Sequence, residues 1–80
     1  MTIGEAVRYR ILQLCEERNL SVNKLSSISG VTQSTVNNII SGRNNSTTVS
    51  TLQKLCDGLG INIQDFFQSD LFVGLEQEIK

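Results

Sequence analysis

Hydrophobic residues recur along this chain with the spacing of helices. In the first 19 residues, Val7, Ile11 and Leu14 fall on one side of a helix, and the aliphatic stem of Arg18 continues that side. A second apolar stripe between residues 48 and 60 consists of Val49, Leu52, Leu55, Cys56 and Leu59. No run of alternating apolar and polar residues is long enough to suggest a sheet. The pattern therefore predicts an all-α chain.

Polar caps and glycines divide this pattern into five helical segments, the first from about Gly4 to Asn19. A small polar side chain can accept free N–H groups at a helix start, and glycine readily adopts the positive φ of a helix end. The candidate caps are Ser21, Thr32, Thr48 and Asn62, and the candidate terminators are Gly30, Gly42 and Gly60. The expected inward residues are Leu25 and Ile28 in the second helix and Ile63, Phe66 and Phe67 in the fifth. Residues 1–80 are thus expected to form one five-helix domain.

The third segment has two faces that separate without overlap. Val36, Ile39 and Ile40 share the apolar side. The opposite side carries only amides and hydroxyls, from Gln33, Ser34, Asn37, Asn38 and Ser41. A solvated helix face usually carries Glu, Lys or Arg, whereas Asn and Gln offer a donor beside an acceptor, which suits the major-groove edge of adenine. The face indicates contact with DNA bases, and the alternative is a polar face that happens to lack charges.

The formal net charge of −1 argues against a nucleic-acid binder until the charges are placed along the chain. From residue 18 to residue 56 the chain has four cations and no acid, namely Arg18, Lys24, Arg43 and Lys54. From residue 57 to residue 80 five acids, Asp57, Asp65, Asp70, Glu76 and Glu78, stand against Lys80 alone. The basic part coincides with the candidate base-contacting unit, and we expect the acidic part to lie away from a phosphate backbone.

Composition excludes several other classes of protein. The chain has no His and only two cysteines, Cys15 and Cys56, so the four usual ligands of a structural zinc are missing. We therefore expect no metal and no cofactor. Both thiols fall on apolar helical faces, where we expect them buried and reduced in a cytoplasmic protein. The start resembles no signal peptide, and no stretch approaches the roughly 20 apolar residues needed to cross a membrane. Since no nucleophile stands beside a base in a recognisable motif, we expect no enzyme. We expect no small-molecule ligand, because no second domain is indicated that could hold one.

The C-terminal tail, residues 69–80, contains an apolar cluster in an otherwise polar and acidic stretch. The cluster consists of Leu71, Phe72, Val73 and Leu75. A small domain has limited surface with which to cover such a group. The tail could cap the core, form a dimer seam or bind a partner, and hydrophobicity does not choose among the three.

Two runs of sequence resemble the helix-turn-helix domain of the phage-repressor and Cro type (Xre-like), a family of DNA-binding regulators. They are ERNLSVNKLSSISGVTQSTVNNIISGR and STLQKLCDGLGINIQDFF. The helix-turn-helix unit would span about residues 21–42, with the turn glycine, the apolar positions and the later caps all in register. The resemblance implies a second helix lying across the DNA backbone and a third entering the major groove.

Carried over to this chain, the resemblance assigns two sets of DNA contacts. Gln33, Ser34 and Asn38 match base-contacting positions. The remaining matches concern the backbone: Thr32 and Thr35 as phosphate or thymine-methyl contacts, Ser41, Arg43 and Asn44 at the end of the third helix and in the polar loop RNNST, and Lys24 as an extra phosphate contact.

The sequence departs from the family pattern at two places. Val22 stands where relatives often have a Gln that bonds a phosphate and supports the neighbouring base-contacting Gln, so we expect Gln33 to be less firmly oriented. Cys15 and Ile40 replace an Arg and a Glu that often pair between the first and third helices. Because both partners are apolar here, no charge is stranded and the fold is expected to be intact.

The leading hypothesis is therefore a sequence-specific regulator of the repressor type that binds double-stranded DNA as a homodimer on a two-fold site. Within the same class, an antitoxin or the controller of a restriction-modification system fits equally well by size. A different class is a protein-interaction module that uses the apolar tail and the acidic C-terminal quarter. Net acidity and Val22 favour that module, and the uncharged face of the third helix, which lacks the Tyr, Trp and Arg of typical protein interfaces, opposes it.

Overall fold

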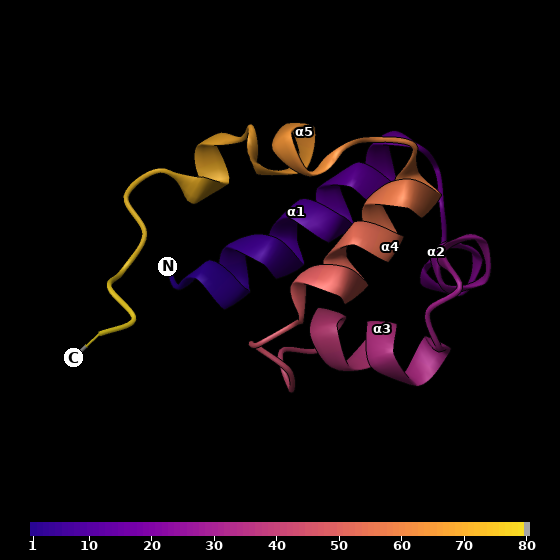
Figure 1. Cartoon of the computed structure of the whole chain (residues 1–80), viewed down its shortest axis with the longest axis horizontal. Helices are drawn as coiled ribbons and strands as arrows, with labels where there is room; N and C mark the ends of the chain where they lie inside the picture. The colour runs from indigo at the N-terminus through magenta and orange to yellow at the C-terminus, as the bar shows by residue number, and fades with distance from the viewer. Residues whose placement is uncertain (80) are drawn as a thin grey trace.

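The computed structural model describes residues 1–79, which form five α-helices and one short 3₁₀ helix (Figure 1). Their bounds are α1 Ile3–Glu17, α2 Val22–Ser29, α3 Gln33–Ile40, α4 Val49–Leu59, α5 Ile63–Phe67 and η1 Asp70–Phe72. The five-helix, all-α class predicted from the pattern is confirmed. Lys80, the last residue of the predicted tail, lies outside the described residues.

The bounds of the first helix differ from the expected ones because of the residues at both of its ends. It begins at Ile3 because Thr2 caps it: the Thr2 hydroxyl accepts the Glu5 N–H at 3.2 Å, and the Glu5 carboxylate accepts the Thr2 N–H at 2.9 Å. It ends at Glu17, and Asn19 then turns the chain with a φ of +55°. Asn tolerates this left-handed conformation better than most residues, so the segment expected as helical through Asn19 is partly a turn.

The four expected caps are confirmed. The side chains of Ser21, Thr32, Thr48 and Asn62 each accept the backbone N–H of the residue three positions ahead. Gly30 and Gly60 end α2 and α4 in the left-handed conformation, with φ of +68° and +75°. These short polar contacts set where the helices that surround the core begin and end.

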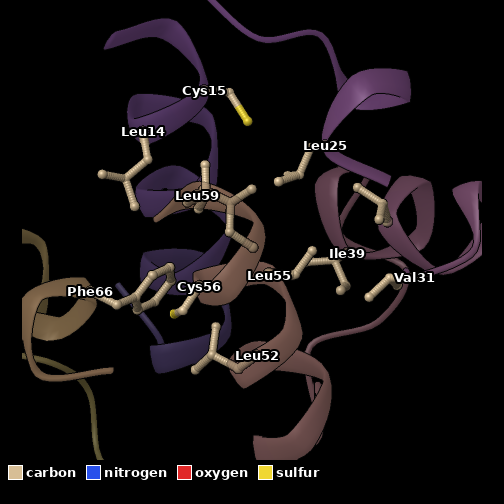
Figure 2. Packing of buried hydrophobic residues seen from close by; sticks show 12 residues of the cluster. Leu14, Cys15, Leu25, Val31, Ile39, Leu52, Leu55, Cys56, Leu59 and Phe66 are labelled. Carbon is tan, nitrogen blue, oxygen red and sulfur yellow. The ribbon is translucent and has the colours of Figure 1, made fainter. Parts of the chain in front are cut away.

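The core lies between α1, α4 and α5 and extends to the inner faces of α2 and α3 (Figure 2). Phe66 of α5 is fully buried and points toward Cys56 of α4. Cys15 and Cys56 are both buried free thiols, as expected, and burial raises the pKa of each above its ordinary value. Protonated thiols in such positions pack as small apolar groups.

Two residues expected to face inward do not. Ile28 is 41% exposed, because the buried side of α2 is set by Leu25, Ser26 and Ser29, and Ile28 lies roughly 100° from its centre. Ser26 is buried instead, and its hydroxyl donates to the backbone carbonyl of Val31. Val49 is 76% exposed since it is the first residue of α4, at the margin of the stripe formed by the later turns.

The tail folds back along the first helix. Phe72 of η1 packs against Phe66 and Phe67, with ring centroids 6.0 and 4.8 Å away, and η1 contacts α1. The backbone N–H of Glu76 donates to the Met1 carbonyl at 3.0 Å. Of the three roles considered for the tail, capping the core is the one that Phe72 has. Val73, in contrast, is 76% exposed.

None of the helices described between residues 1 and 79 has the length and apolar character that a membrane span requires.

Candidate nucleic-acid interface

The turn between α2 and α3 sets the position of the third helix. Gly30 reverses the chain, Val31 is buried at 9% exposure, and the carbonyl of Val31 accepts the Ser26 hydroxyl. Thr32 then caps α3 through the N–H of Thr35 at 3.2 Å. Because the turn is tied to the core at Val31 and to α2 at Ser26, α3 leaves it at a defined angle. In Figure 1, α3 lies along the lower edge of the bundle.

The two faces of α3 separate in the structure as their spacing predicts. Val36 and Ile39 are 0% and 2% exposed, and Ile40 packs against the core. On the other side Gln33, Ser34, Asn37 and Ser41 are exposed and Asn38 is half-buried. The three predicted base-contacting residues, Gln33, Ser34 and Asn38, thus belong to one accessible polar face. A helix with such a face fits the width of the major groove.

Gln33 is supported by a residue that the sequence argument missed. Its side-chain Nε2 donates a hydrogen bond to Oδ1 of Asn23, in the first turn of α2. The expectation that Val22 leaves Gln33 loosely oriented is therefore wrong, because the next residue along supplies the support and Val22 packs toward the core. The sequence feature that could have indicated this contact is the amide residue Asn23 at the exposed start of α2.

This hydrogen bond leaves Gln33 with the groups that an adenine needs. One hydrogen of its Nε2 is used by Asn23, while the second hydrogen and the carbonyl Oε1 have no partner among residues 1–79. Recognition of adenine uses one amide donor toward N7 and one amide acceptor toward the N6 amino group. The contact with Asn23 thus orients the amide without consuming its capacity to bind a base.

The threonines at the start of α3 are engaged with each other. The hydroxyls of Thr32 and Thr35 lie 2.8 Å apart, and Thr32 also accepts the Thr35 N–H. Thr32 therefore has a structural role as the cap in addition to its predicted contact with DNA. Thr35 is half-buried and Thr32 is exposed.

The end of α3 continues into a loop whose polar groups are ordered by the backbone. The Ser41 hydroxyl donates to the Asn38 carbonyl at 3.3 Å, and the Asn44 N–H donates to the same carbonyl at 3.0 Å. Oδ1 of Asn44 accepts the Ser46 N–H at 2.8 Å. Since that bond fixes the acceptor end of the Asn44 amide within the loop, its NH₂ donors are left for another acceptor, such as a phosphate oxygen.

Exposed cations accompany the polar face, and two of the acids lie at the opposite edge of the bundle. Lys24 on α2 and Arg43 in the α3–α4 loop are exposed, and neither lies within 4.0 Å of a carboxylate in residues 1–79. Asp65 and Asp70 belong to α5 and η1, on the opposite edge of the bundle from α3 (Figure 1). These two carboxylates lie away from the surface where a phosphate backbone would lie, whereas Glu78 lines a hollow together with Asn44 and Ser46 of the α3–α4 loop.

Known proteins share the sequence pattern and the fold of this chain. A family model described as the Cro/C1-type helix-turn-helix DNA-binding domain matches residues 10–69. The crystal structure of the prophage Lp1 protein 11 is similar, with 38% identity and a TM-score of 0.77 over 86% of this chain and 91% of that chain. The wild-type restriction-modification controller protein C.Esp1396I shares the fold at 18% identity, with a TM-score of 0.77 over 84% of this chain and 86% of that chain. No curated protein sequence matches the chain.

Proposed function

Because this chain belongs to the Cro/C1-type helix-turn-helix DNA-binding family, we propose that it is a sequence-specific transcriptional regulator of the repressor type. The family expected from the sequence is thereby confirmed, and with it the role of a DNA-binding regulator. The prophage protein, 38% identical, shares the fold over most of both chains, which supports the same family. The observation that carries the finer proposal is the uncharged polar face of α3, with Gln33 oriented by Asn23.

In this proposal α3 enters the major groove with its first turn against the base edges. Gln33 contacts an adenine through its free amide hydrogen and Oε1, Ser34 contacts the neighbouring base, and Asn38 contacts a third one turn further along. The absence of charge on this face favours discrimination by hydrogen-bond pattern over general attraction to DNA.

The remaining predicted residues bind the sugar-phosphate backbone on both sides of α3. They are Lys24, Thr32 and Thr35 near its start, and Ser41, Arg43 and Asn44 at its end and in the following loop. Lys24 and Arg43 supply charge, and the Asn44 NH₂ supplies a neutral donor. Such contacts fix the register of the helix on the duplex without selecting a sequence.

The regulator acts as a homodimer on a two-fold site. One α3 with two exposed flanking cations provides modest affinity, and a second copy multiplies it because the second half-site binds at a high effective concentration. The expected operator has half-sites about 10 base pairs apart, or a multiple of that distance.

Selection from a random duplex library at low salt tests the proposal. The chain should enrich one motif with two-fold symmetry, and the variant with both Gln33→Ala and Asn38→Ala should lose the preference while keeping its helical circular dichroism. A parent protein that enriches no sequence would refute specific recognition and favour the protein-interaction alternative. Enrichment of a single asymmetric half-site, with a 1:1 complex in sedimentation, would refute the dimer and keep the base contacts.

A further inference from the structure

Two of the three arginines in α1 and at its C-cap are committed to the fold. Arg10 donates through Nε to the Phe66 carbonyl at 2.7 Å and through Nη2 to the Asp65 carbonyl at 2.9 Å. Arg18 donates through Nε to the Leu59 carbonyl at 3.0 Å. Each guanidinium thus joins α1 to the C-terminal half of the chain and satisfies carbonyls at helix ends.

Arg8 is different, because its guanidinium is directed to the end of α3. A Cβ built on Gly42 would lie 2.5 Å from Nη1 of Arg8, so the guanidinium rests directly against this glycine. It also lies over the Tyr9 ring, with Cζ 4.9 Å from the ring centroid. Within residues 1–79, Arg8 has no carboxylate within 4.0 Å and no hydrogen-bond acceptor.

The first two turns of α1 and the α3–α4 loop are in close contact. Gly42 has a φ of +83°, and a Cβ on Gly4 would lie 2.9 Å from the Asn45 side chain. Both glycines therefore allow the loop to approach α1 closely. Gly42 itself separates Ser41 from Arg43, two residues in the proposed backbone-contacting set.

The end of α3 creates an electrostatic problem for a phosphate. Its last carbonyls give the C-terminus of a helix a partial negative charge equivalent to roughly half an electron, which repels an anion. A phosphate held by Ser41, Arg43 and Asn44 would lie near this terminus. A guanidinium at Gly42 neutralises the helix end and presents unused N–H donors at the same point.

We propose that Arg8 binds a DNA phosphate at the C-terminal end of α3, so that α1 forms part of the DNA interface. The inference rests on the proposed function and extends it to a residue outside the helix-turn-helix unit and outside the acid-free segment. Arg8 and Arg43 then flank one phosphate site from two elements, with Gly42 between them.

Salt dependence of binding distinguishes this role from a structural one. Affinity for the selected operator and for an unrelated duplex is measured at several salt concentrations for the parent, Arg8→Gln and Arg8→Lys. Loss of one phosphate contact should lower the slope of log affinity against log salt by about 1 in Arg8→Gln, for both duplexes alike. Arg8→Lys should retain most of the slope, and Arg43→Gln is the positive control.

Arg10→Gln is the matched control, since it removes the same charge two residues away on the same helix. It should lower the thermal midpoint, because two carbonyls lose their donor, and leave the salt slope unchanged. Arg8→Gln with a parental slope and a lowered midpoint would overturn the proposal and make Arg8 a cap of α3. A parent protein without salt-dependent DNA binding would instead overturn the proposed function itself.

Discussion

The α3 edge and the α5 edge of this bundle use their polar groups in opposite ways. At the α5 edge, Arg10 donates to carbonyls of α5, and Phe66, Phe67 and Phe72 form one aromatic cluster. At the α3 edge, by contrast, Lys24 and Arg43 have no carboxylate partner within residues 1–79. The first edge satisfies its bonds within the chain, whereas the second leaves donors and acceptors available.

The contrast shows how a small bundle of helices separates folding from recognition. At the α5 edge burial is complete at Phe66, which belongs to the same core cluster as residues of α1 and α4. The core contacts of α3 come from Val36, Ile39 and Ile40 on its inner face, so the residues of its outer face can be chosen for DNA. Substitutions at the α5 edge should therefore change the free energy of unfolding, and substitutions at the α3 edge should change DNA binding.

Phe66→Ala should have the largest effect, and it should fall on stability. The ring is 0% exposed, and removal of a buried aromatic side chain costs about 3 to 5 kcal/mol in free energy of unfolding. Urea denaturation measures the loss, and Val73→Ala, at a residue 76% exposed, is the control that should change little.

A milder variant keeps this test decisive if Phe66→Ala does not fold. Phe66→Leu retains most of the apolar volume and should lose less stability. Folded Phe66→Leu should bind the operator like the parent. A loss of sequence preference in that folded variant would show that the two edges are not separate.

Gln33→Ala should have the next largest effect, and it should fall on binding alone. Loss of a bidentate base contact costs about 1 to 3 kcal/mol in discrimination, measured as the affinity ratio for operator and mutated operator.

Asn23→Ala should lose less of this discrimination. The double variant should be no worse than Gln33→Ala, because Asn23 acts through Gln33. Ser27→Ala changes an exposed residue of α2, the helix that carries Asn23, and is the control that should keep the discrimination of the parent. Additive losses would contradict the supporting role of Asn23.

The smallest expected effect concerns pH and the start of α1. Hydrogen bonds from the Thr2 backbone N–H and then from the Thr2 hydroxyl hold the pKa of Glu5 below its ordinary value of 4.5. A lowered folded pKa means that the contribution of Glu5 is present above pH 4.5 and is lost as the pH falls through the lowered pKa.

Thermal midpoints of the parent and Glu5→Gln measure that contribution. They should differ near neutral pH and converge in acid, while the sequence preference stays the same in both. A difference that grows in acid would contradict the assignment. A changed sequence preference would mean that the start of α1 shapes the α3 edge.

Local chemistry made most of the fold predictable from the sequence. The caps at Ser21, Thr32, Thr48 and Asn62 and the terminators Gly30 and Gly60 act through neighbouring residues, so their spacing alone identifies them. The inward positions of Ile28 and Val49 were wrong because helical spacing gives the direction of a side chain but not what covers it. Which neighbour covers a short helix depends on tertiary packing.

The candidate site was predictable in part for the same reason. The polar face of α3 is a local pattern, and the structure brings Gln33, Ser34 and Asn38 to one accessible side. Asn23 and Arg8 were missed because each reaches α3 from another helix, 10 and 34 positions away from Gln33 and Gly42 in the chain. Such contacts depend on how helices cross, and spacing within one helix carries no information about them.

The bond between Asn23 and Gln33 has a consequence for how this regulator could acquire a new target. A change at Gln33 alone alters the proposed base contact and also leaves the Asn23 amide oxygen without its donor. A change at Asn23 alone frees the Gln33 amide to rotate, which broadens the range of operators tolerated. Divergence toward another operator is therefore expected to pass through a relaxed intermediate at position 23, followed by a compensating replacement at position 33.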